Sequence, residues 1–202
     1  MKAQFLEGRP WAQTRTGRGF PLIRPTAADV HWPDVVYSLA HINRFAGHVG
    51  EYSVAQHCVL VSENLPHGAK PYGLLHDAHE FVTGDITTPA ARALAAIADR
   101  WAGGLAGSYV SAAIKALKSN IDSAIHIAAD LTWPIPQEIA EAVHIADQRA
   151  LMTEARDLMA PAPASWGYDH VVPFSETIER WPADKALARY MWELQRHSIA
   201  LI

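Results

Sequence analysis

The chain has 202 residues, of which 50% are hydrophobic and 19% are charged, and its formal net charge is −4. This length fits one domain, and we expect an N-terminal arm (1–30) followed by a helical core (31–202). A net negative chain lacks the basic face of a nucleic-acid binder, and no run of 18 apolar residues or signal-peptide pattern predicts a membrane anchor. A single cysteine, Cys58, excludes an internal disulfide and suits a reducing compartment, so we expect a cytoplasmic protein.

Spacing of apolar residues predicts an all-α fold. Glycines and prolines among β-prone residues in 11–25 indicate a hairpin or extended arm. Ser53 and Gln56 have the spacing of a capping box, which would open one of the helices. The predicted helices cover residues 34–45, 53–65, 71–81, 89–100, 109–129, 137–159 and 183 to near the C-terminus. Residues 160–180 are rich in proline and aromatics and are predicted to form an ordered loop.

The run LLHDAHEFVTGDITTP concentrates side chains that bind metals or protons. It contains the pair His76-Asp77, then Glu80 about one helical turn later and Asp85 just past a glycine. Imidazole and carboxylate ligands suit divalent Zn, Mn, Co, Fe or Ni. A metal held by such residues lowers the pKa of water and neutralises phosphoryl charge, so the pattern favours phosphate ester hydrolysis.

Taken singly, each of these residues has a plainer interpretation. A lone interior histidine is more often hydrogen-bonded in a core than bound to a metal. A lone aspartate in a helix is usually solvated, and a bare His-Asp pair occurs by chance. The combination is more specific because it recurs with His57 upstream in SVAQH and Asp147 downstream in HIADQRALMTEARDL.

Three segments together resemble the HD-domain phosphohydrolases, and within them the bacterial and phage 5′-deoxynucleotidase group with its related phage dATP triphosphohydrolases. The segments are NRFAGHVGEYSVAQHCVLVS, LLHDAHEFVTGDITTP and HIADQRALMTEARDL. The resemblance covers nearly the whole chain and implies an HD-domain helical bundle that binds a divalent metal ion.

Carried over by position, the resemblance implies a role for each matching residue. The implied metal ligands are His57, His76, Asp77 and Asp147. The implied catalytic carboxylates are Glu80, which would orient or activate water, and Asp85. The implied substrate contacts are Arg44 to phosphate, Phe45 to sugar or base, Asp85 to the sugar, and Thr88 and Pro89 along the same wall.

The sequence departs from the group's pattern at two of these places. Phe45 stands where the group usually has tryptophan, and Ala91 stands where it often has lysine, with Arg92 adjacent. The first departure leaves the sugar or base contact open, and the second leaves the phosphate count and the substrate preference open.

The resemblance predicts hydrolysis of 2′-deoxynucleotides, either as a dNMP 5′-nucleotidase or as a dNTP triphosphohydrolase, with dATP among the candidates. One alternative is hydrolysis of a signalling nucleotide, although such proteins usually carry additional domains. A second is a non-catalytic metal or nucleotide sensor, which would not need to retain Glu80. The seven tryptophans also favour a homo-oligomer, because aromatic residues are enriched at interfaces.

Overall fold

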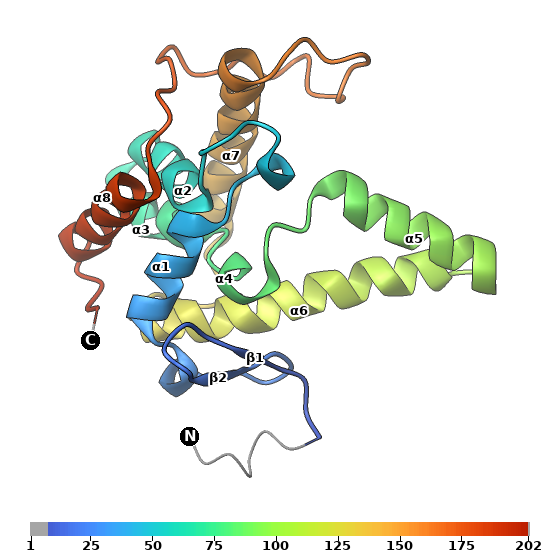
Figure 1. The fold of residues 1–202 in the computed structure, drawn as a ribbon, viewed down its shortest axis with the longest axis horizontal. Helices are drawn as coiled ribbons and strands as arrows, with labels where there is room; N and C mark the ends of the chain where they lie inside the picture. Colours follow the sequence, from blue (N-terminus) through green and yellow to red (C-terminus); the bar gives the residue numbers. More distant parts are fainter. Residues whose placement is uncertain (1–7, 202) are drawn as a thin grey trace.

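The computed structural model describes residues 8–201 and is all-α apart from one short β-hairpin, which confirms the predicted fold class (Figure 1). The strands are β1 (Trp11–Gln13) and β2 (Gly19–Pro21), and the helices are α1 (Trp32–His41), α2 (Val54–Glu63), α3 (Lys70–Leu75), α4 (Glu80–Thr83), α5 (Thr88–Ala102), α6 (Ala106–Ala128), α7 (Gln137–Leu158) and α8 (Ala183–Arg196). Within residues 8–201, no helix is both long and apolar enough to cross a bilayer.

The hairpin predicted for residues 11–25 is present. Strands β1 and β2 pair antiparallel with Trp11 opposite Pro21. Gly17 has a φ of 81° in the connecting turn, a conformation that glycine adopts without steric cost. Residues 1–7 of the expected arm lie outside the described residues.

Asp34, at the start of α1, fastens the hairpin to the helical core. Its buried carboxylate accepts hydrogen bonds from the Thr14 hydroxyl at 2.7 Å and from the Thr16 hydroxyl and backbone N–H at 2.6 and 3.0 Å. His31 Nδ1 lies 2.9 Å away on the same carboxylate. Burial by itself would raise the pKa of Asp34, but the threonine and histidine hydrogen bonds outweigh it and lower the pKa. The carboxylate is therefore ionised and saturated with donors.

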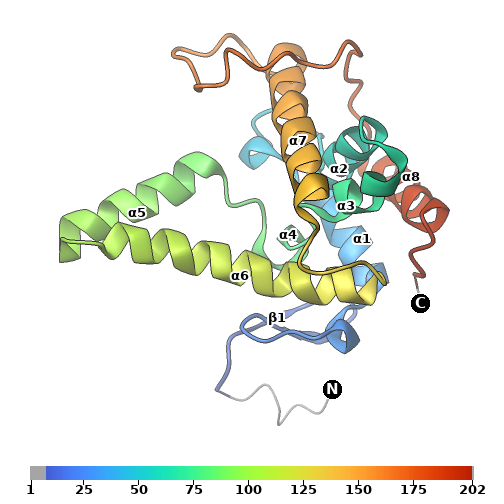
Figure 2. The same cartoon turned by 180° about the vertical axis from the view of Figure 1, so that it is seen from behind.

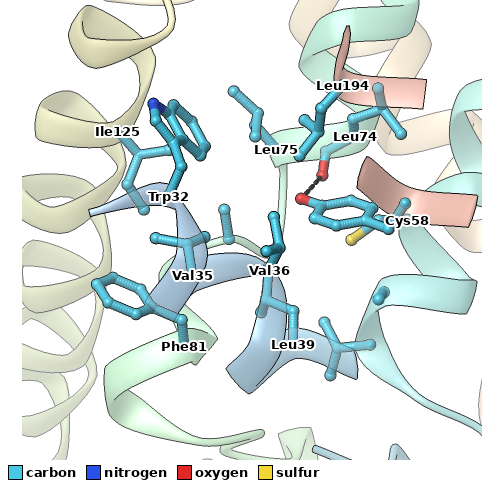
Figure 3. Close-up of a cluster of buried hydrophobic side chains, with 14 of the residues drawn as sticks. Trp32, Val35, Val36, Leu39, Cys58, Leu74, Leu75, Phe81, Ile125 and Leu194 are labelled. Carbon is cyan, nitrogen blue, oxygen red and sulfur yellow. Dashed lines mark hydrogen bonds between the residues drawn. The ribbon is translucent and has the colours of Figure 1, made fainter. Parts of the chain in front are cut away.

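The main core forms between α1, α2, α3, α6 and α8 (Figure 3). Its buried side chains include Trp32, Val35, Val36 and Leu39 from α1, Leu74 and Leu75 from α3, Ile125 from α6 and Leu194 from α8. Cys58 is fully buried among them, so its thiol has no route to solvent. The hydroxyl of Tyr190 donates to the Leu74 carbonyl at 2.7 Å, which satisfies the one polar atom of that ring.

A second cluster sets the position of α7 against α2 and α3. Val143, Ala146 and Ala150 of α7 are buried with Val61 and Tyr72. These three α7 residues are spaced by three and four, so they form one stripe on the helix. Packing along this stripe fixes the rotation of α7, and with it the direction of the polar residues next to the stripe.

Two helices depart from the course that their apolar spacing predicts: one ends early and one is interrupted. The helix expected to reach residue 45 stops at His41, because Asn43 pairs with Ser53 and the Arg44 N–H donates to the Tyr52 carbonyl at 2.9 Å. The helix expected over 71–81 is interrupted between α3 and α4 by three-residue turns.

The interruption has a local cause. His76 Nδ1 lies 2.8 Å from the Gly73 carbonyl, which residue 77 would use in a continuous α-helix. The tight turns that follow carry His76 and Asp77 out of the regular helix.

The predicted capping box is half present. The Ser53 hydroxyl accepts from the Gln56 N–H at 3.2 Å, as an N-cap does. The Gln56 side chain does not form the second bond of a capping box, which would be to the Ser53 backbone N–H. It donates to the Glu179 carbonyl at 2.7 Å and accepts from the Trp181 N–H at 2.9 Å, so it ties the ordered loop to α2.

Replacing Asp34 by alanine is predicted to destabilise the protein by about 2–3 kcal/mol, because four hydrogen bonds to a buried carboxylate are lost. Chemical denaturation followed by circular dichroism measures the change. Asp184→Ala, at an exposed position in the first turn of α8, serves as the control and should change stability by less than ~1 kcal/mol. Equal effects of the two substitutions would contradict the anchoring role of Asp34.

Candidate metal centre

Three elements bring the four predicted metal ligands together. His57 comes from the first turn of α2, His76 and Asp77 from the turn after α3, and Asp147 from α7. His57 Nε2 lies 3.1 Å from both His76 Nε2 and Asp147 Oδ1. Asp77 Oδ2 lies 3.3 Å from His76 Nε2 and 3.6 Å from His57 Nε2. The donor atoms of His57, His76 and Asp147 thus converge, and an Asp77 oxygen lies against the two imidazoles.

The hydrogen bonds of the two imidazoles fix which ring nitrogen faces this point. His76 Nδ1 donates to the Gly73 carbonyl, which can only accept, at 2.8 Å. His57 Nδ1 donates to the Glu154 carboxylate at 2.6 Å. With both Nδ1 atoms protonated, the two Nε2 atoms face each other at 3.1 Å. A proton on one of them or a metal ion between them would satisfy both lone pairs.

The donor set fits a divalent metal ion. His57, His76 and Asp147 each offer a ligand atom within 4.8 Å of the others. Ligands about 2.0–2.2 Å from a shared ion are spaced about 3–3.5 Å apart, and the distances of 3.1 to 3.7 Å among these atoms are close to that. The mixed nitrogen and oxygen chemistry suits a transition metal better than calcium or magnesium.

The electrostatics of the cluster also favour a positive charge at its centre. Burial disfavours the charged form of His76, but Asp77 and Asp147 outweigh it and raise the pKa of His76 well above its usual value. Burial likewise opposes ionisation of Asp77, yet His76, His57 and Arg44 hold its pKa well below the usual range. The two carboxylates are therefore ionised and draw a cation towards the imidazoles.

Glu154, which the sequence interpretation did not single out, lies directly behind this cluster. Its fully buried carboxylate accepts from His57 Nδ1 at 2.6 Å, from the Tyr52 hydroxyl at 2.9 Å and from Arg44 Nε and Nη2 at 3.2 and 3.1 Å. Burial would raise the pKa of Glu154, but Arg44 and His57 lower it. A sequence signal did exist, since Glu154 follows Asp147 by seven residues, two helical turns along the same face.

Arg44 is more constrained than a free phosphate-binding arginine. Two of its nitrogens are engaged with Glu154, and its Nη1 lies 3.4 Å from Asp77 Oδ2. Its carboxylate neighbours raise its pKa further above the usual value, against the effect of burial. The guanidinium is thus permanently charged and rigid, with Nη1 at the metal-ligand cluster.

Phe45 follows Arg44 on the same turn and begins an aromatic wall. Its ring centroid lies 5.5 Å from the Arg44 guanidinium carbon and 6.3 Å from the ring of Trp166. Trp166 comes from the loop that follows α7, and sequence interpretation did not connect it to the site. The two rings create a partly exposed apolar surface beside the charged cluster.

Glu80 differs from the other acidic residues of the site because it is neutral. Its side chain is buried, and its Oε2 atom has no hydrogen-bond partner among the described residues. Burial raises the pKa of Glu80 to about 9, and repulsion from Asp77 and Asp85 adds to this effect. Glu80 therefore carries a proton at neutral pH.

Glu80 also belongs to a second group of donors, with Asp77 and His79, whose ligand atoms lie within 4.8 Å of one another. His79 Nδ1 lies 3.0 Å from Asp122 on α6, and this contact ties the turn to that helix.

The remaining predicted substrate contacts divide into two kinds. Asp85 lies next to Gly84, whose φ is 68°, with the Phe45 backbone close to its carboxyl. Burial and Asp77 raise the pKa of Asp85. Thr88 and Pro89 are exposed at the start of α5, and the structure does not bring them into the donor cluster.

A lysine that sequence interpretation missed stands near these carboxyls. Lys118 on α6 interacts electrostatically with both Glu80 and Asp85. It supplies a positive charge on this side of the site. The related group often has a lysine at the position of Ala91, and this chain does not. Arg92 does not take that place, because its side chain is exposed on α5.

The fold and the site together define an all-α protein with a candidate metal centre. No protein-family model matches the chain. The chain is 30% identical to the uncharacterized protein YfdR of Escherichia coli K12 over 171 residues, 84% of each chain. It is 30% identical to the uncharacterized protein RCAP_rcc00048 of Rhodobacter capsulatus over 160 residues, 74% of each chain. The chain belongs to the family that these two proteins represent.

Replacing Glu154 by glutamine is predicted to weaken divalent-metal binding by about 10–100-fold, the usual effect of losing a carboxylate behind a histidine ligand. The amide removes the negative charge behind His57 and places an N–H₂ group among donors. Competition with a fluorescent chelator measures the affinity. Glu193→Gln, which alters a buried glutamate on α8 paired with Arg189 at 2.8 Å, is the matched control. Unchanged metal affinity in a folded Glu154→Gln protein would contradict this role.

The pKa of Glu80 predicts a pH dependence of stability in the metal-free protein. Its folded pKa of about 9 exceeds the ordinary value of 4.5. A raised folded pKa gives a contribution that is complete below pH 4.5 and is lost as pH rises through 9. Glu80→Gln should therefore gain thermal stability relative to the unmodified chain as pH rises across this window. Thermal denaturation in the presence of a chelator tests this, and parallel curves for the two proteins would refute it.

Proposed function

We propose that this chain is a metal-dependent phosphohydrolase of the HD-domain class that acts on 2′-deoxynucleotides. The observation that supports it most is the convergence of two imidazole nitrogens and two ionised carboxylates beside a buried, protonated carboxyl. Pairs of acidic groups whose surroundings drive their pKa values apart are typical of acid–base sites.

The four residues that would hold the ion are His57, His76, Asp77 and Asp147. A divalent ion bound there would polarise a phosphoryl oxygen and neutralise its charge. Co, Mn, Zn, Fe and Ni all suit a ligand set of two histidines and two aspartates.

Glu80 is the proposed acid–base group. As the ester P–O bond breaks, its carboxyl gives a proton to the leaving oxygen, and the resulting carboxylate takes a proton from the water whose oxygen joins the phosphorus. Its unpartnered Oε2 leaves one carboxyl oxygen available for this exchange.

The surrounding residues suit the parts of a nucleotide. Arg44 and Lys118 provide positive charge for phosphate. The rings of Phe45 and Trp166 offer an apolar surface for a base. Asp85 would accept a hydrogen bond from the 3′-hydroxyl of the sugar, and the tight turn at Gly84 restricts its movement.

The rigid Asp85 turn supports a deoxyribose preference, because it leaves little freedom to accommodate a 2′-hydroxyl. Cleavage of dNMP and of dNTP are both compatible with the site, and so is a signalling nucleotide. The protonated Glu80 favours an enzyme over a metal or nucleotide sensor, since binding alone does not require an acid–base group.

Product analysis on a panel of dAMP, dATP, AMP, ATP and a cyclic dinucleotide tests the proposal, with each divalent metal supplied in turn. We expect release of phosphate or triphosphate from the deoxy substrates and at least ~10-fold lower efficiency on the ribo forms. Glu80→Gln should keep metal binding and reduce turnover by about 10²–10⁴-fold, and His76→Ala should lose both metal and turnover.

The outcomes separate the alternatives. Equal efficiency on ribo and deoxy substrates would reject sugar selection by Asp85. Metal and nucleotide binding without turnover on any substrate would instead identify a sensor.

A further inference from the structure

Helices α5 and α6 form an arm that reaches away from the rest of the molecule. Both views show the end of α5 and the start of α6 standing clear of the other helices (Figures 1 and 2). We call residues 88–117 of this pair of helices the arm from here on; it is separate from the N-terminal segment 1–30. The two helices pack on each other tightly: the Gly107 N–H donates to Asp99 at 2.7 Å, and a Cβ on Gly107 would lie 2.5 Å from the Ala95 carbonyl oxygen. The arm is therefore a rigid hairpin.

The arm leaves large apolar side chains in solvent. No residue of α5 is buried. Leu94, Ile97 and Trp101 lie on one face of α5, because they are spaced by three and four residues. Trp101 is 88% exposed, and beyond it Leu105 and Tyr109, at the same end of the arm, are 64% and 71% exposed.

This surface approaches the size of a stable interface. Two aromatic and three aliphatic side chains exposed to this degree offer on the order of 500 Å², and the exposed alanines of the arm add to it. A stable pair of proteins buries about 800 Å² on each partner. Exposed apolar patches of several hundred Å² mark interaction sites.

The low charge of the arm favours an apolar occupant. Among its 30 residues the only charged ones are Arg92, Asp99, Arg100 and Lys115, and Asp99 is already engaged with Gly107. A face with so few charges has no pattern to select a charged partner. An identical arm matches it in composition, shape and apolar character. Two helical hairpins that pair in this way form a four-helix bundle, which buries the apolar face of each.

We propose that the arm is the interface between two copies of this chain, with Trp101, Ile97 and Leu94 as its central contacts. A two-fold pair places the same patch on both sides, so each copy covers the other's exposed residues. Because the arms stand clear of the rest of the chain, they can lie together without contact between the metal centres. This inference does not depend on the proposed hydrolytic activity.

Sedimentation and light scattering of the full chain test the pairing. The unmodified protein should have twice the chain mass of 22.2 kDa at micromolar concentration. Trp101→Glu and Leu94→Glu should each weaken association by about 30-fold or more, as loss of a central contact does. Both positions are exposed in the single chain, so circular dichroism should show an unchanged helix content.

Ile127→Glu is the matched control, because Ile127 is 56% exposed near the opposite end of α6 and lies outside the arm. It should leave the dimer intact. In a second measurement, Ile97→Cys should give a cross-linked dimer with a short bis-maleimide, whereas the buried Cys58 should not react. The proposal is overturned if the unmodified protein is monomeric, or if the dimer survives both glutamate substitutions in the arm. A monomeric protein would mean that a different partner covers the arm.

Discussion

The buried carboxylate of Glu154 is the interaction on which the site depends. It joins α7 to α2 through His57, and it joins α7 to the segment between α1 and α2 through Arg44 and Tyr52. A fully buried carboxylate is tolerated only when its charge is compensated and its oxygens are hydrogen-bonded. These three partners meet both conditions, so the arrangement of the three elements cannot change without exposing an unpaired charge. Asp147, two turns earlier on α7, is consequently held opposite His57.

The same geometry divides the acidic residues of the site into two classes. Asp77, Asp147 and Glu154 lie among imidazoles and a guanidinium, so their pKa values are lowered. Burial raises the pKa values of Glu80 and Asp85, and repulsion from neighbouring carboxylates adds to the effect. Ionised groups therefore collect where a cation would bind, while the protonated Glu80 lies on the adjoining wall. Hydrolytic chemistry at neutral pH uses such a division.

The molecule also separates two physical tasks. The metal centre is built where α2, α7 and the turn after α3 meet, against cores that exclude solvent. The arm of α5 and α6 has few buried side chains and keeps its shape through close helix contacts. Because Asp85 directly precedes the arm, the chain leaves the site and enters the exposed hairpin within a few residues. A shift of α5 would therefore displace Asp85 before the other residues of the site.

The sequence by itself determined the all-α class, the hairpin and most helix positions, because apolar periodicity, glycines and prolines act over short distances. It also named the four residues whose donor atoms the structure brings together. The tertiary structure alone decided that the helix after Pro71 breaks at His76, where a side-chain hydrogen bond takes a backbone carbonyl. It alone placed Glu154, Lys118 and Trp166 at the site and left α5 exposed. Contacts between residues about 40 to 120 positions apart place these three side chains, and of the three only Glu154 had a local sequence signal, its seven-residue spacing from Asp147.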